Sequence, residues 1–303
     1  MATVRELVQR ATADLTAAQC PSPAVDAQLL LAFALNLDTK ILNLDLEVPQ
    51  TTVELFNDFV STRSTRVPVQ HITGAAYFRH LVLKVGPGVF IPRPETELLV
   101  QPGLDYLAQI SGPKLVVDLC AGSGAVGLSV ALESANTTVH AVELSPSAFK
   151  WLEENIKAYA QQLAAINSTV ICYNEDAGDR EVLKNLAGQV DLVLSNPPYI
   201  PDEMIPREAE VRDHDPALAL FGGEDGLDIA RKVAQVAADL LKDDGLFGME
   251  HADVQSQSAA TMLTEMKINQ QPVWINVKDN NDYNQLPRFV TANRKTLTSG
   301  VLS

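Results

Sequence analysis

Four consecutive residues in the second half of the chain have the chemistry to hold a flat nitrogen group. They are Asn196, Pro197, Pro198 and Tyr199, and they directly follow a predicted strand at 191–195. Neither proline has an N–H, so the pair ends the strand and fixes a turn whose carbonyl groups face outward. The side-chain oxygen of Asn196 and the carbonyl of Pro197 could accept the two N–H bonds of an amide or aromatic amine, while Tyr199 packs against its face. Such acceptors would align the nitrogen for methyl transfer and favour the positive charge developing on it.

A glycine-rich turn after an earlier predicted strand could bind a nucleoside ligand. The turn consists of Cys120, Ala121, Gly122, Ser123 and Gly124, between a strand at 115–119 and a helix. Its glycines let the backbone turn tightly and approach a ligand closely, and the string from Gly122 to Gly127 also fits the dinucleotide fingerprint G-x-G-x-x-G. Asp118 would repel a pyrophosphate but suits the ammonium and sulfonium of S-adenosylmethionine. It therefore favours that methyl donor over a nicotinamide cofactor.

Two more acids follow predicted strands. Glu143 ends a strand at 138–143 and could accept hydrogen bonds from both ribose hydroxyls, a feature that both ligands share. Asp176 follows a strand at 169–173, where an adenine edge could be read. A capping or solvated role is the plain alternative for each acid.

The elements that must position these residues alternate from Lys114 onward. Candidate strands lie at 115–119, 138–143, 169–173, 191–195, 245–250, 273–277 and 288–292, and helical stretches follow the first five. Alternating βα units predict an α/β fold with a mostly parallel sheet covered on both faces. Ligands bind beyond the carboxyl ends of the strands in such sheets, which is where both motifs lie.

The first 70 residues show helical patterns only. Leu7, Ala11 and Leu15 recur at helical spacing, and Ser22 is placed to cap a helix with Pro23 in its first turn. Alternating apolar residues between 74 and 90 suit a short hairpin. We therefore expect a small helical bundle joined to the α/β part by a hairpin connector.

Composition argues against several classes of protein. The net charge of −15 over 303 residues disfavours a protein that holds bare nucleic acid by neutralising phosphates. The 3 cysteines are too few for a disulfide framework or a zinc site, and the 5 histidines have no metal-ligand spacing, so we expect no metal. No leader peptide and no apolar run of about 20 residues is evident, which favours a cytoplasmic protein away from membranes.

With these features the chain resembles the HemK/PrmC family of S-adenosylmethionine-dependent methyltransferases. These enzymes methylate the side-chain amide of the glutamine in the Gly-Gly-Gln motif of bacterial peptide chain release factors. The likeness extends to segments 66–74 (Arg-Val-Pro-Val-Gln-His-Ile-Thr-Gly), 90–97 (Phe-Ile-Pro-Arg-Pro-Glu-Thr-Glu) and 216–228. Adenine and guanine methyltransferases share the Asn-Pro-Pro-Tyr motif, whereas the proline-rich stretch and the helical N-terminal part narrow the family.

The resemblance implies a division of labour along the chain. A helical bundle at 1–73 would dock the release factor, 74–90 would be a hairpin linker, and 91–303 would be the methyltransferase domain on a Rossmann-like class I seven-stranded sheet. The methyl donor S-adenosylmethionine, which leaves as S-adenosylhomocysteine, would be bound by residues 120–124, Glu143 and Asn196, and also by Asp118, Asp176 and Ala177. Residues 196–199 would hold the substrate glutamine. The protein would act as a monomer, without binding nucleic acid or membrane.

Some positions depart from the family pattern or have open roles. Cys120 stands where many members have glycine, Glu143 replaces the more usual aspartate, and Ala177 stands where some members stack an aromatic ring on the adenine. Arg93 and Glu95 either shape the pocket entrance or serve as an ion pair or cap. The acids Glu203, Glu208 and Glu210 are expected on a solvated face of the loop after Tyr199, which could also act as a lid.

Three other functions compete with this interpretation. A DNA or RNA exocyclic-amine N-methyltransferase would use the same Asn-Pro-Pro-Tyr motif, but the first 70 residues carry five basic residues against eight acids. A non-catalytic nucleoside-binding protein would need a damaged site, and Asp118, Gly122, Gly124 and Asn196 are all intact. A nicotinamide oxidoreductase conflicts with Asp118 and leaves residues 196–199 unexplained.

Overall fold

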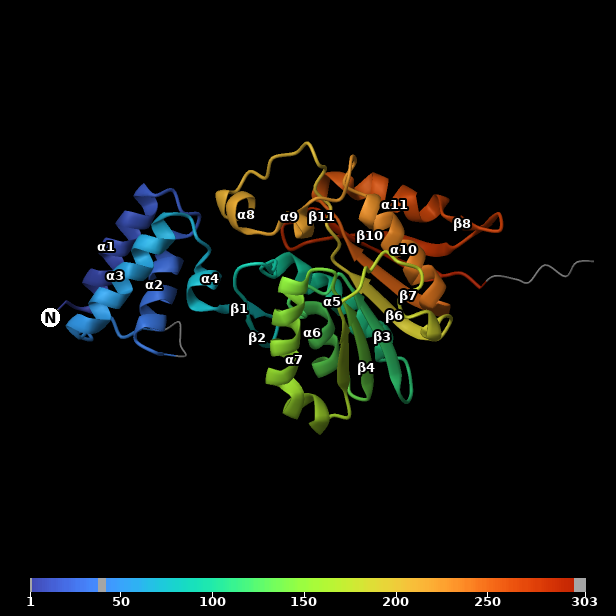
Figure 1. Ribbon diagram of the computed structural model, residues 1–303, viewed down its shortest axis with the longest axis horizontal. Helices are drawn as coiled ribbons and strands as arrows, with labels where there is room; N and C mark the ends of the chain where they lie inside the picture. The colour runs from blue at the N-terminus through green and yellow to red at the C-terminus, as the bar shows by residue number, and fades with distance from the viewer. Residues whose placement is uncertain (1, 38–41, 297–303) are drawn as a thin grey trace, which may run out of the picture. The chain divides into compact units, whose positions relative to one another are not determined.

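The computed structural model describes residues 2–37 and 42–296, and the chain divides into two compact units (Figure 1). The first unit consists of Met1–Ala75, Val85–Pro87 and Ile205–Asp215. The second consists of Ala76–Lys84, Gly88–Met204 and Pro216–Ser303. The chain therefore leaves the second unit after Met204, contributes 11 residues to the first, and returns at Pro216.

Four helices build the N-terminal part of the first unit. They are α1 (Val4–Ala17), α2 (Pro23–Ala34), α3 (Gln50–Ser64) and α4 (Val69–Thr73). A capping box begins α1, because Thr3 and Glu6 each accept the backbone N–H of the other. Ser22 is at the N-cap of α2, although its hydroxyl makes no capping hydrogen bond. This confirms the predicted helical N-terminal part, whose core includes the fully buried Leu7, Leu15, Leu30, Leu31 and Phe56.

The eleven-residue segment Ile205–Asp215 joins this unit through a buried ion network. It contains α8 (Ala209–His214), whose Glu210 accepts hydrogen bonds from Arg63 Nη2 at 2.7 Å and from Arg66 Nε at 2.9 Å. Arg63 also donates from Nε to Asp26 at 2.7 Å. The expectation that Glu210 lies on a solvated face is wrong, since its side chain is only 13% exposed. Arg63 is buried and Arg66 lies beside it, so the charge of Asp26 alone cannot balance both arginines. Glu210 supplies the second negative charge and is buried for that reason.

The expected hairpin follows the bundle. Its strands are β1 (Ala75–Phe78) and β2 (Leu81–Lys84), which form a separate two-stranded sheet. Asn155 supports the second strand from α7 (Pro146–Ala165): its Oδ1 accepts the backbone N–H of Lys84 at 2.8 Å, and its Nδ2 donates to the Lys84 carbonyl at 3.0 Å. Asn155 is fully buried, so both of these hydrogen bonds are shielded from water.

A seven-stranded sheet forms the centre of the second unit and confirms the predicted fold class. The strands are β3 (Lys114–Leu119), β4 (Thr137–Val142), β5 (Thr169–Tyr173), β6 (Val190–Ser195), β7 (Leu241–Glu250), β10 (Trp274–Asn281) and β11 (Pro287–Arg294), in the order β10-β11-β7-β6-β3-β4-β5. The five strands β3 to β7 are parallel, and β11 is antiparallel to both of its neighbours. The order reverses between β3 and β6, and in open α/β sheets ligands bind beyond the carboxyl ends of the strands at such a reversal.

Helices cover both faces of this sheet (Figure 1). On one face, α5 (Glu97–Leu107), which follows the short turn η1 (Pro94–Thr96), packs against β6, β7 and α6 (Ala125–Glu133). On the other, α10 (Asp228–Leu240) packs against β6 and β7, and α11 (Ser256–Glu265) against β10 and β11. The main core lies under α10 and α11 and includes Val193, Phe247 and Met249. The remaining elements are short: α9 (Ala217–Leu220), η2 (Lys184–Leu186), η3 (Asp253–Gln255), β8 (Lys267–Ile268) and β9 (Gln271–Pro272).

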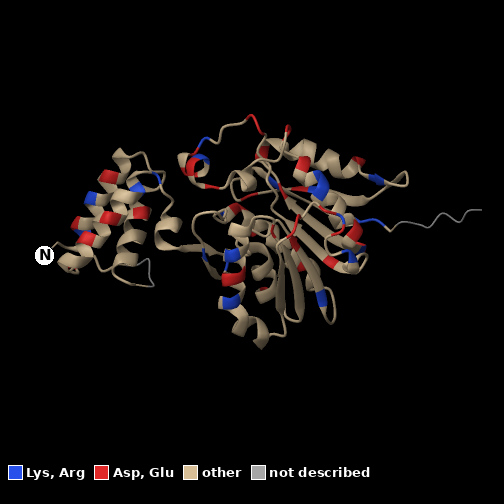
Figure 2. Ribbon diagram, viewed as in Figure 1, with Lys and Arg blue, Asp and Glu red and all other residues tan. Residues whose placement is uncertain are grey.

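Charge is mixed along both units. Figure 2 shows acidic and basic residues interspersed along the helices and not separated by sign. Within residues 2–37 and 42–296, no helix is long and apolar enough to cross a membrane. In the same residues, no group of three or more His, Cys, Asp or Glu is arranged to hold a metal ion, and Cys20, Cys120 and Cys172 are free thiols.

Candidate active site

The Asn-Pro-Pro-Tyr motif forms a corner at the carboxyl end of β6. All six residues of β6 are buried, and the chain becomes partly exposed at Asn196. Ser195 Oγ donates to the carbonyl of Leu119, the last residue of β3, at 2.7 Å. This bond ties together the ends of the two strands from which both predicted motifs continue. The structure thus brings the corner and the glycine-rich turn to the same edge of the sheet.

The backbone after the corner is bonded to a second loop. The N–H of Ile200 donates to the carbonyl of Leu220, and the N–H of Gly222 donates back to the carbonyl of Ile200, both at 2.8 Å. Gln255 Nε2 donates to the carbonyl of Tyr199 at 2.9 Å. These three hydrogen bonds hold the chain after Pro198, and the bond from Ser195 holds it before Asn196. The corner is therefore held at both ends.

Two glycines allow this close approach. A Cβ on Gly222 would lie 2.5 Å from the carbonyl oxygen of Pro198, and a Cβ on Gly226 would overlap the carbonyl oxygen of Tyr199. Gly226 also has a φ of +75°, in the left-handed region that favours glycine. The segment 216–228, which matched the family by its letters, therefore has a physical role in backing the corner.

The corner has two acceptors without a partner in the described part of the chain. Asn196 Nδ2 donates to Thr96 Oγ1 at 3.2 Å, while its Oδ1 accepts no hydrogen bond from the described residues. The carbonyl of Pro197 likewise accepts none from the described part of the chain. These are the two oxygens that the sequence predicted as acceptors for a planar nitrogen.

Behind the corner, Tyr199 meets a buried acid. Its hydroxyl donates to Glu250 Oε1, at the end of β7, at 3.4 Å. Burial, together with the negative charge of Glu250, raises the pKa of the Tyr199 hydroxyl above its usual range. Tyr199 is therefore a neutral hydrogen-bond donor here rather than a base.

The glycine-rich turn contains a strained residue and an unsatisfied hydroxyl. Cys120 has a φ of +65°, a conformation that costs a non-glycine residue energy and explains why glycine is common there in the family it resembles. Ser123 is 2% exposed, and its buried Oγ has no hydrogen-bond partner among the described residues. Asn155 Nδ2 donates to the carbonyl of Ser123 at 2.9 Å and so fixes the turn from α7. The described residues thus leave one buried hydroxyl of the held turn without a partner.

Glu143 fixes the same turn from the neighbouring strand. Its Oε2 accepts the N–H of Gly122 at 2.8 Å, and its Oε1 accepts the N–H of Ser145 at 2.7 Å. Burial raises the pKa of Glu143, and these backbone hydrogen bonds oppose that rise. The carboxylate is thus held between the turn and the start of α7.

Asp118 lies deeper than the other predicted residues. It is 1% exposed, and its Oδ2 accepts the N–H of Gly127, in the first part of α6, at 2.8 Å. Burial, with a contribution from the negative charge of Glu143, raises the pKa of Asp118 to about 7. No lysine or arginine in the described residues forms an ion pair with it. Because Asp118 is buried beneath the glycine-rich turn, its charge would act on a ligand at a distance and not by direct contact.

The last predicted residues differ in their surroundings. Asp176 is exposed after β5, and its Oδ1 accepts the N–H of Gly178 at 2.8 Å. Ala177 is 4% exposed and packs into the main core, where its side chain cannot stack on a base. Arg93 lies over the ring of Phe90, with its guanidinium carbon 4.8 Å from the ring centroid.

Sequence reasoning did not single out Thr96, Asn155 or Gln255, although each bonds to a predicted site residue or its loop. Thr96 and its neighbours do lie in the proline-rich stretch at 90–97, which was a signal for that residue. Asn155 and Gln255 lie in ordinary helical or turn sequence, which carries no such signal.

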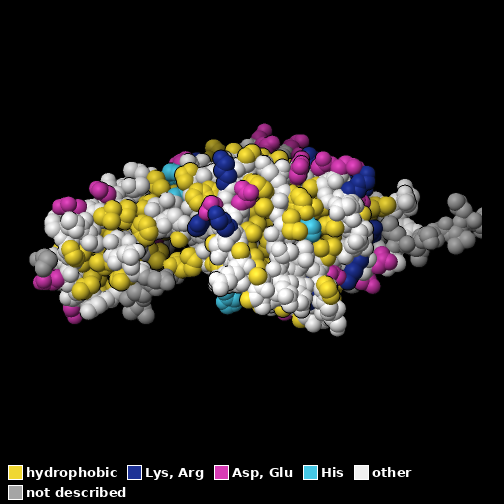
Figure 3. Space-filling model, turned by 60° about the horizontal axis from the view of Figure 1, so that its bottom comes forward, with side chains coloured by type: hydrophobic (Ala, Val, Ile, Leu, Met, Phe, Trp, Pro, Cys, Tyr) yellow, Lys and Arg dark blue, Asp and Glu magenta, His cyan; other side chains and the backbone are white. Residues whose placement is uncertain are grey.

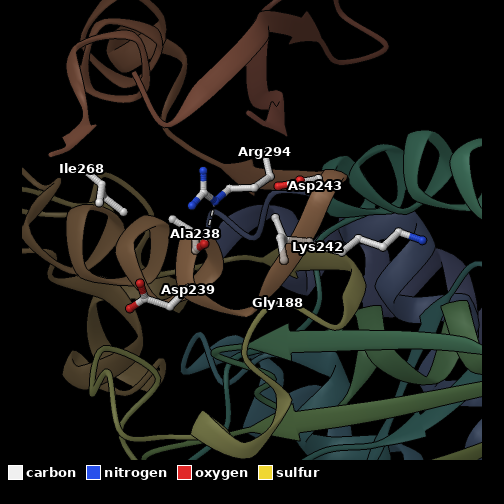
Figure 4. Close-up of a pocket in the computed structure, with 8 residues that line it drawn as sticks. Gly188, Ala238, Asp239, Lys242, Asp243, Ile268 and Arg294 are labelled. Carbon is white, nitrogen blue, oxygen red and sulfur yellow. Dashed lines mark hydrogen bonds between the residues drawn. The ribbon is translucent and has the colours of Figure 1, made fainter. Parts of the chain in front are cut away.

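A cavity of about 460 Å³ lies elsewhere in the second unit (Figure 4). It is lined by residues that include Asp239 near the end of α10, Lys242 near the start of β7 and Arg294 at the end of β11. Arg294 Nε donates to the carbonyl of Ala238 at 2.7 Å, so its guanidinium is already engaged. Asn196 follows the opposite, carboxyl edge of the parallel strands, so this cavity is separate from the candidate active site.

Comparisons with known proteins agree with this geometry. A family model for the PrmC N-terminal domain matches residues 6–74, and one described as conserved hypothetical protein 95 matches residues 70–219. Release factor glutamine methyltransferase of Streptomyces coelicolor is 43% identical over 96% of this chain and 97% of its own length. Proteins of the same name from Bifidobacterium longum (44% identical; 82% and 87% covered) and Mycolicibacterium smegmatis (38%; 97% and 99%) are also similar. The chain therefore belongs to the release factor glutamine methyltransferase family.

Proposed function

We propose that this protein transfers a methyl group from S-adenosylmethionine to the side-chain amide nitrogen of the glutamine in the Gly-Gly-Gln motif of peptide chain release factors. The observation that carries the proposal is a pair of acceptors on the corner, Asn196 Oδ1 and the Pro197 carbonyl, to which no described residue donates. They lie at the same sheet edge as a turn suited to a nucleoside. A primary amide has two N–H donors, which these two oxygens would satisfy.

The residues of the turn fit the proposed methyl donor. S-adenosylmethionine, when bound, supplies an electrophilic methyl group on a positively charged sulfur. The unpaired Ser123 hydroxyl gives the ligand a polar contact, and the two oxygens of Glu143 suit ribose hydroxyls. Asp118 adds negative potential beneath the turn, which favours a cationic ligand over a pyrophosphate.

The corner supplies what amide methylation requires. An amide nitrogen is a poor nucleophile because its lone pair is delocalised into the carbonyl. Acceptance of both N–H bonds by Asn196 and Pro197 holds the nitrogen in line with the methyl group and stabilises the positive charge that develops on it. Tyr199 packs beside the flat substrate, and Pro198 fixes the turn. The methylated nitrogen then loses its proton easily, so no strong base is needed.

We propose that the helical part at 1–73 docks the release factor, with 74–90 as linker and 91–303 as the methyltransferase domain. Its helices α2 and α3 expose large apolar side chains, among them Val25 (57% exposed), Phe33 and Leu55. Phe33 and Phe59 are in contact, with ring centroids 5.3 Å apart. Figure 3 shows hydrophobic side chains gathered over this unit. Exposed apolar surface of this kind is typical of protein interaction sites.

One labelling experiment tests the proposal. Purified protein and labelled methyl donor are offered release factor, DNA and RNA side by side. We expect label in the release factor only, and its loss when the glutamine of Gly-Gly-Gln is changed to alanine. Label in DNA or RNA would instead support the exocyclic-amine alternative. We also propose that the protein acts as a cytoplasmic monomer.

A further inference from the structure

The chain that follows the corner lies beside a later stretch of backbone. Residues 200–202 and 220–223 are joined by three backbone hydrogen bonds of 2.8 to 3.0 Å, and we refer to them together as the backing pair. The chain that connects the two halves of this pair contains Ile205–Asp215, which belongs to the first unit. The two halves of the backing pair are therefore linked through residues that the helical unit holds.

The backing pair lies against the corner itself. A Cβ on Gly222 would be 2.5 Å from the carbonyl oxygen of Pro198, so a shift of this backbone would displace the corner. The pair contains one isolated β-bridge, between Ile200 and Phe221. Such a short pairing is weak alone, because closing the loop 203–219 costs conformational entropy that grows with loop length. An attachment that holds the middle of this loop therefore also stabilises the backing pair.

Charge holds the middle of the loop to the helices. The loop contains α8, and none of the six described residues of α8 is buried. Within α8, Glu210 accepts hydrogen bonds from Arg63 at 2.7 Å and from Arg66 Nε at 2.9 Å. The side chains of the two arginines are 5% and 23% exposed, and that of Glu210 is 13% exposed. Arg63 lies in α3 and Arg66 just after it, so one acidic side chain fixes the loop to the helical bundle.

We propose that Glu210 is a positioning residue for methyl transfer: its ion pairs with Arg63 and Arg66 let the helical bundle hold the backing pair, and with it the corner, in the geometry that accepts the substrate amide. The inference rests on the proposed function, because it concerns the same corner. Glu210 acts by stabilising this part of the fold and meets neither substrate nor methyl donor. The unit proposed to dock the release factor thus also secures the site of transfer.

The test compares Glu210→Gln with the matched control Glu208→Gln. Glu208 is exposed and precedes α8, and its side chain makes no capping hydrogen bond. Both substitutions remove one negative charge from the same segment, but only Glu210→Gln removes the partner of the two arginines. Arg66→Gln leaves the bond from Arg63 in place, so it should show the same pattern more weakly. It decides the question if Glu210→Gln does not fold.

Hydrogen exchange of the ligand-free protein is the first readout. We expect peptides covering 199–204 and 216–226 to exchange about tenfold faster in Glu210→Gln, a factor close to the net contribution of one hydrogen bond. Peptides from β7 should keep the wild-type rate, and Glu208→Gln should change none of these rates. Faster exchange confined to the helices of the first unit would overturn the inference, because Glu210 would then stabilise the bundle alone.

Steady-state kinetics with the release factor are the second readout. Positioning predicts that kcat falls about tenfold in Glu210→Gln, while KM for the release factor and the affinity for S-adenosylhomocysteine stay within about twofold of wild type. A raised KM with unchanged kcat would contradict the inference and assign the ion pairs to docking alone. Failure of wild type to methylate a release factor would count against the proposed function, and the exchange rates would still decide whether Glu210 holds the corner.

Discussion

The two units bury carboxylates in opposite ways. In the first unit, burial would raise the pKa of Glu210, but hydrogen bonds from Arg66 and Arg63 outweigh it and lower the pKa to about 2. In the second unit, burial raises the pKa of Asp118 and of Glu250 to about 7, and only backbone, hydroxyl or more distant charges oppose it. Two arginines thus balance the negative charge of Glu210, whereas no arginine or lysine among the described residues forms an ion pair with Asp118 or Glu250.

This difference distinguishes a buried charge that stabilises the fold from a buried charge that serves a function. A buried acid between two arginines holds a segment in place, as Glu210 holds Ile205–Asp215 to the helices of its unit. An acid buried without such partners lowers the stability of the free protein unless a ligand or a titration makes use of it. Asp118 and Glu250 lie beside the turn and the corner, which fits that second class.

The largest effect is expected from breaking the buried ion network that joins Glu210 and Asp26 to Arg63 and Arg66. Arg63→Ala leaves Asp26 buried and removes one of the two arginine partners of Glu210. Loss of one partner of a buried ion pair costs about 3–5 kcal/mol, so we expect a drop of that order in the free energy of unfolding. Urea denaturation followed by far-UV circular dichroism measures it. A drop below about 1 kcal/mol would mean that the network is no more than a surface pair.

Removing the buried charge of Asp118 should raise the free energy of unfolding, which is the opposite of the effect expected for Arg63→Ala. Asp118→Asn keeps the acceptor for the Gly127 N–H but removes a charge that burial disfavours. At pH 8 we expect the ligand-free variant to be more stable than wild type by about 2 kcal/mol. We expect it to bind S-adenosylmethionine about tenfold more weakly, as measured by calorimetry. A variant that is less stable and binds the donor normally would assign Asp118 a structural role only.

The pH dependence of stability should also differ between the units. The lowered pKa of Glu210 means that its contribution is present above its ordinary value of 4.5 and is lost as pH falls through about 2. The raised pKa of Asp118 means that its contribution is present below 3.8 and is lost as pH rises through about 7. The free energy of unfolding of ligand-free wild type should therefore fall more between pH 5 and 8 than that of Asp118→Asn. Parallel curves would contradict the assignment.

The smallest effect is expected at an exposed ion pair. Arg180 donates to Asp239 at 2.7 Å, but its side chain is 58% exposed. Exposed pairs contribute at most about 1 kcal/mol, so Arg180→Ala should change the free energy of unfolding by no more than that. It is the matched control for Arg63→Ala, and a comparable loss in both would remove burial as the cause.

The sequence predicted the strands because their signal is local. The seven predicted strands correspond to the seven of the sheet, and most ends agree within a few residues, since buried β-branched runs and turn residues lie next to each other in the chain. The corner was predictable for the same reason, because two prolines must end a strand. The roles proposed for residues 118–124, 143 and 196–199 stay predictions, although the fold brings them to one sheet edge.

What the sequence could not predict depends on distant pairs. Arg63 and Glu210 are separated by 147 residues, so no local pattern distinguishes Glu210 from the solvated acids near it. Thr96 meets Asn196 across 100 residues for the same reason. Two strand ends differ most from the prediction. The strand β7 begins at Leu241 and not at 245, and β10 continues to Asn281, beyond the predicted 277, with two irregularities in its pairing with β11.

The most direct test of the account is Asn196→Ala, assayed for both methyl transfer to the release factor and binding of S-adenosylhomocysteine. We expect kcat to fall by roughly 10²–10³, the cost of losing one oriented group that acts in the transition state, while binding of the product weakens much less. Turnover equal to that of wild type would contradict the central claim that this asparagine holds the amide nitrogen for transfer.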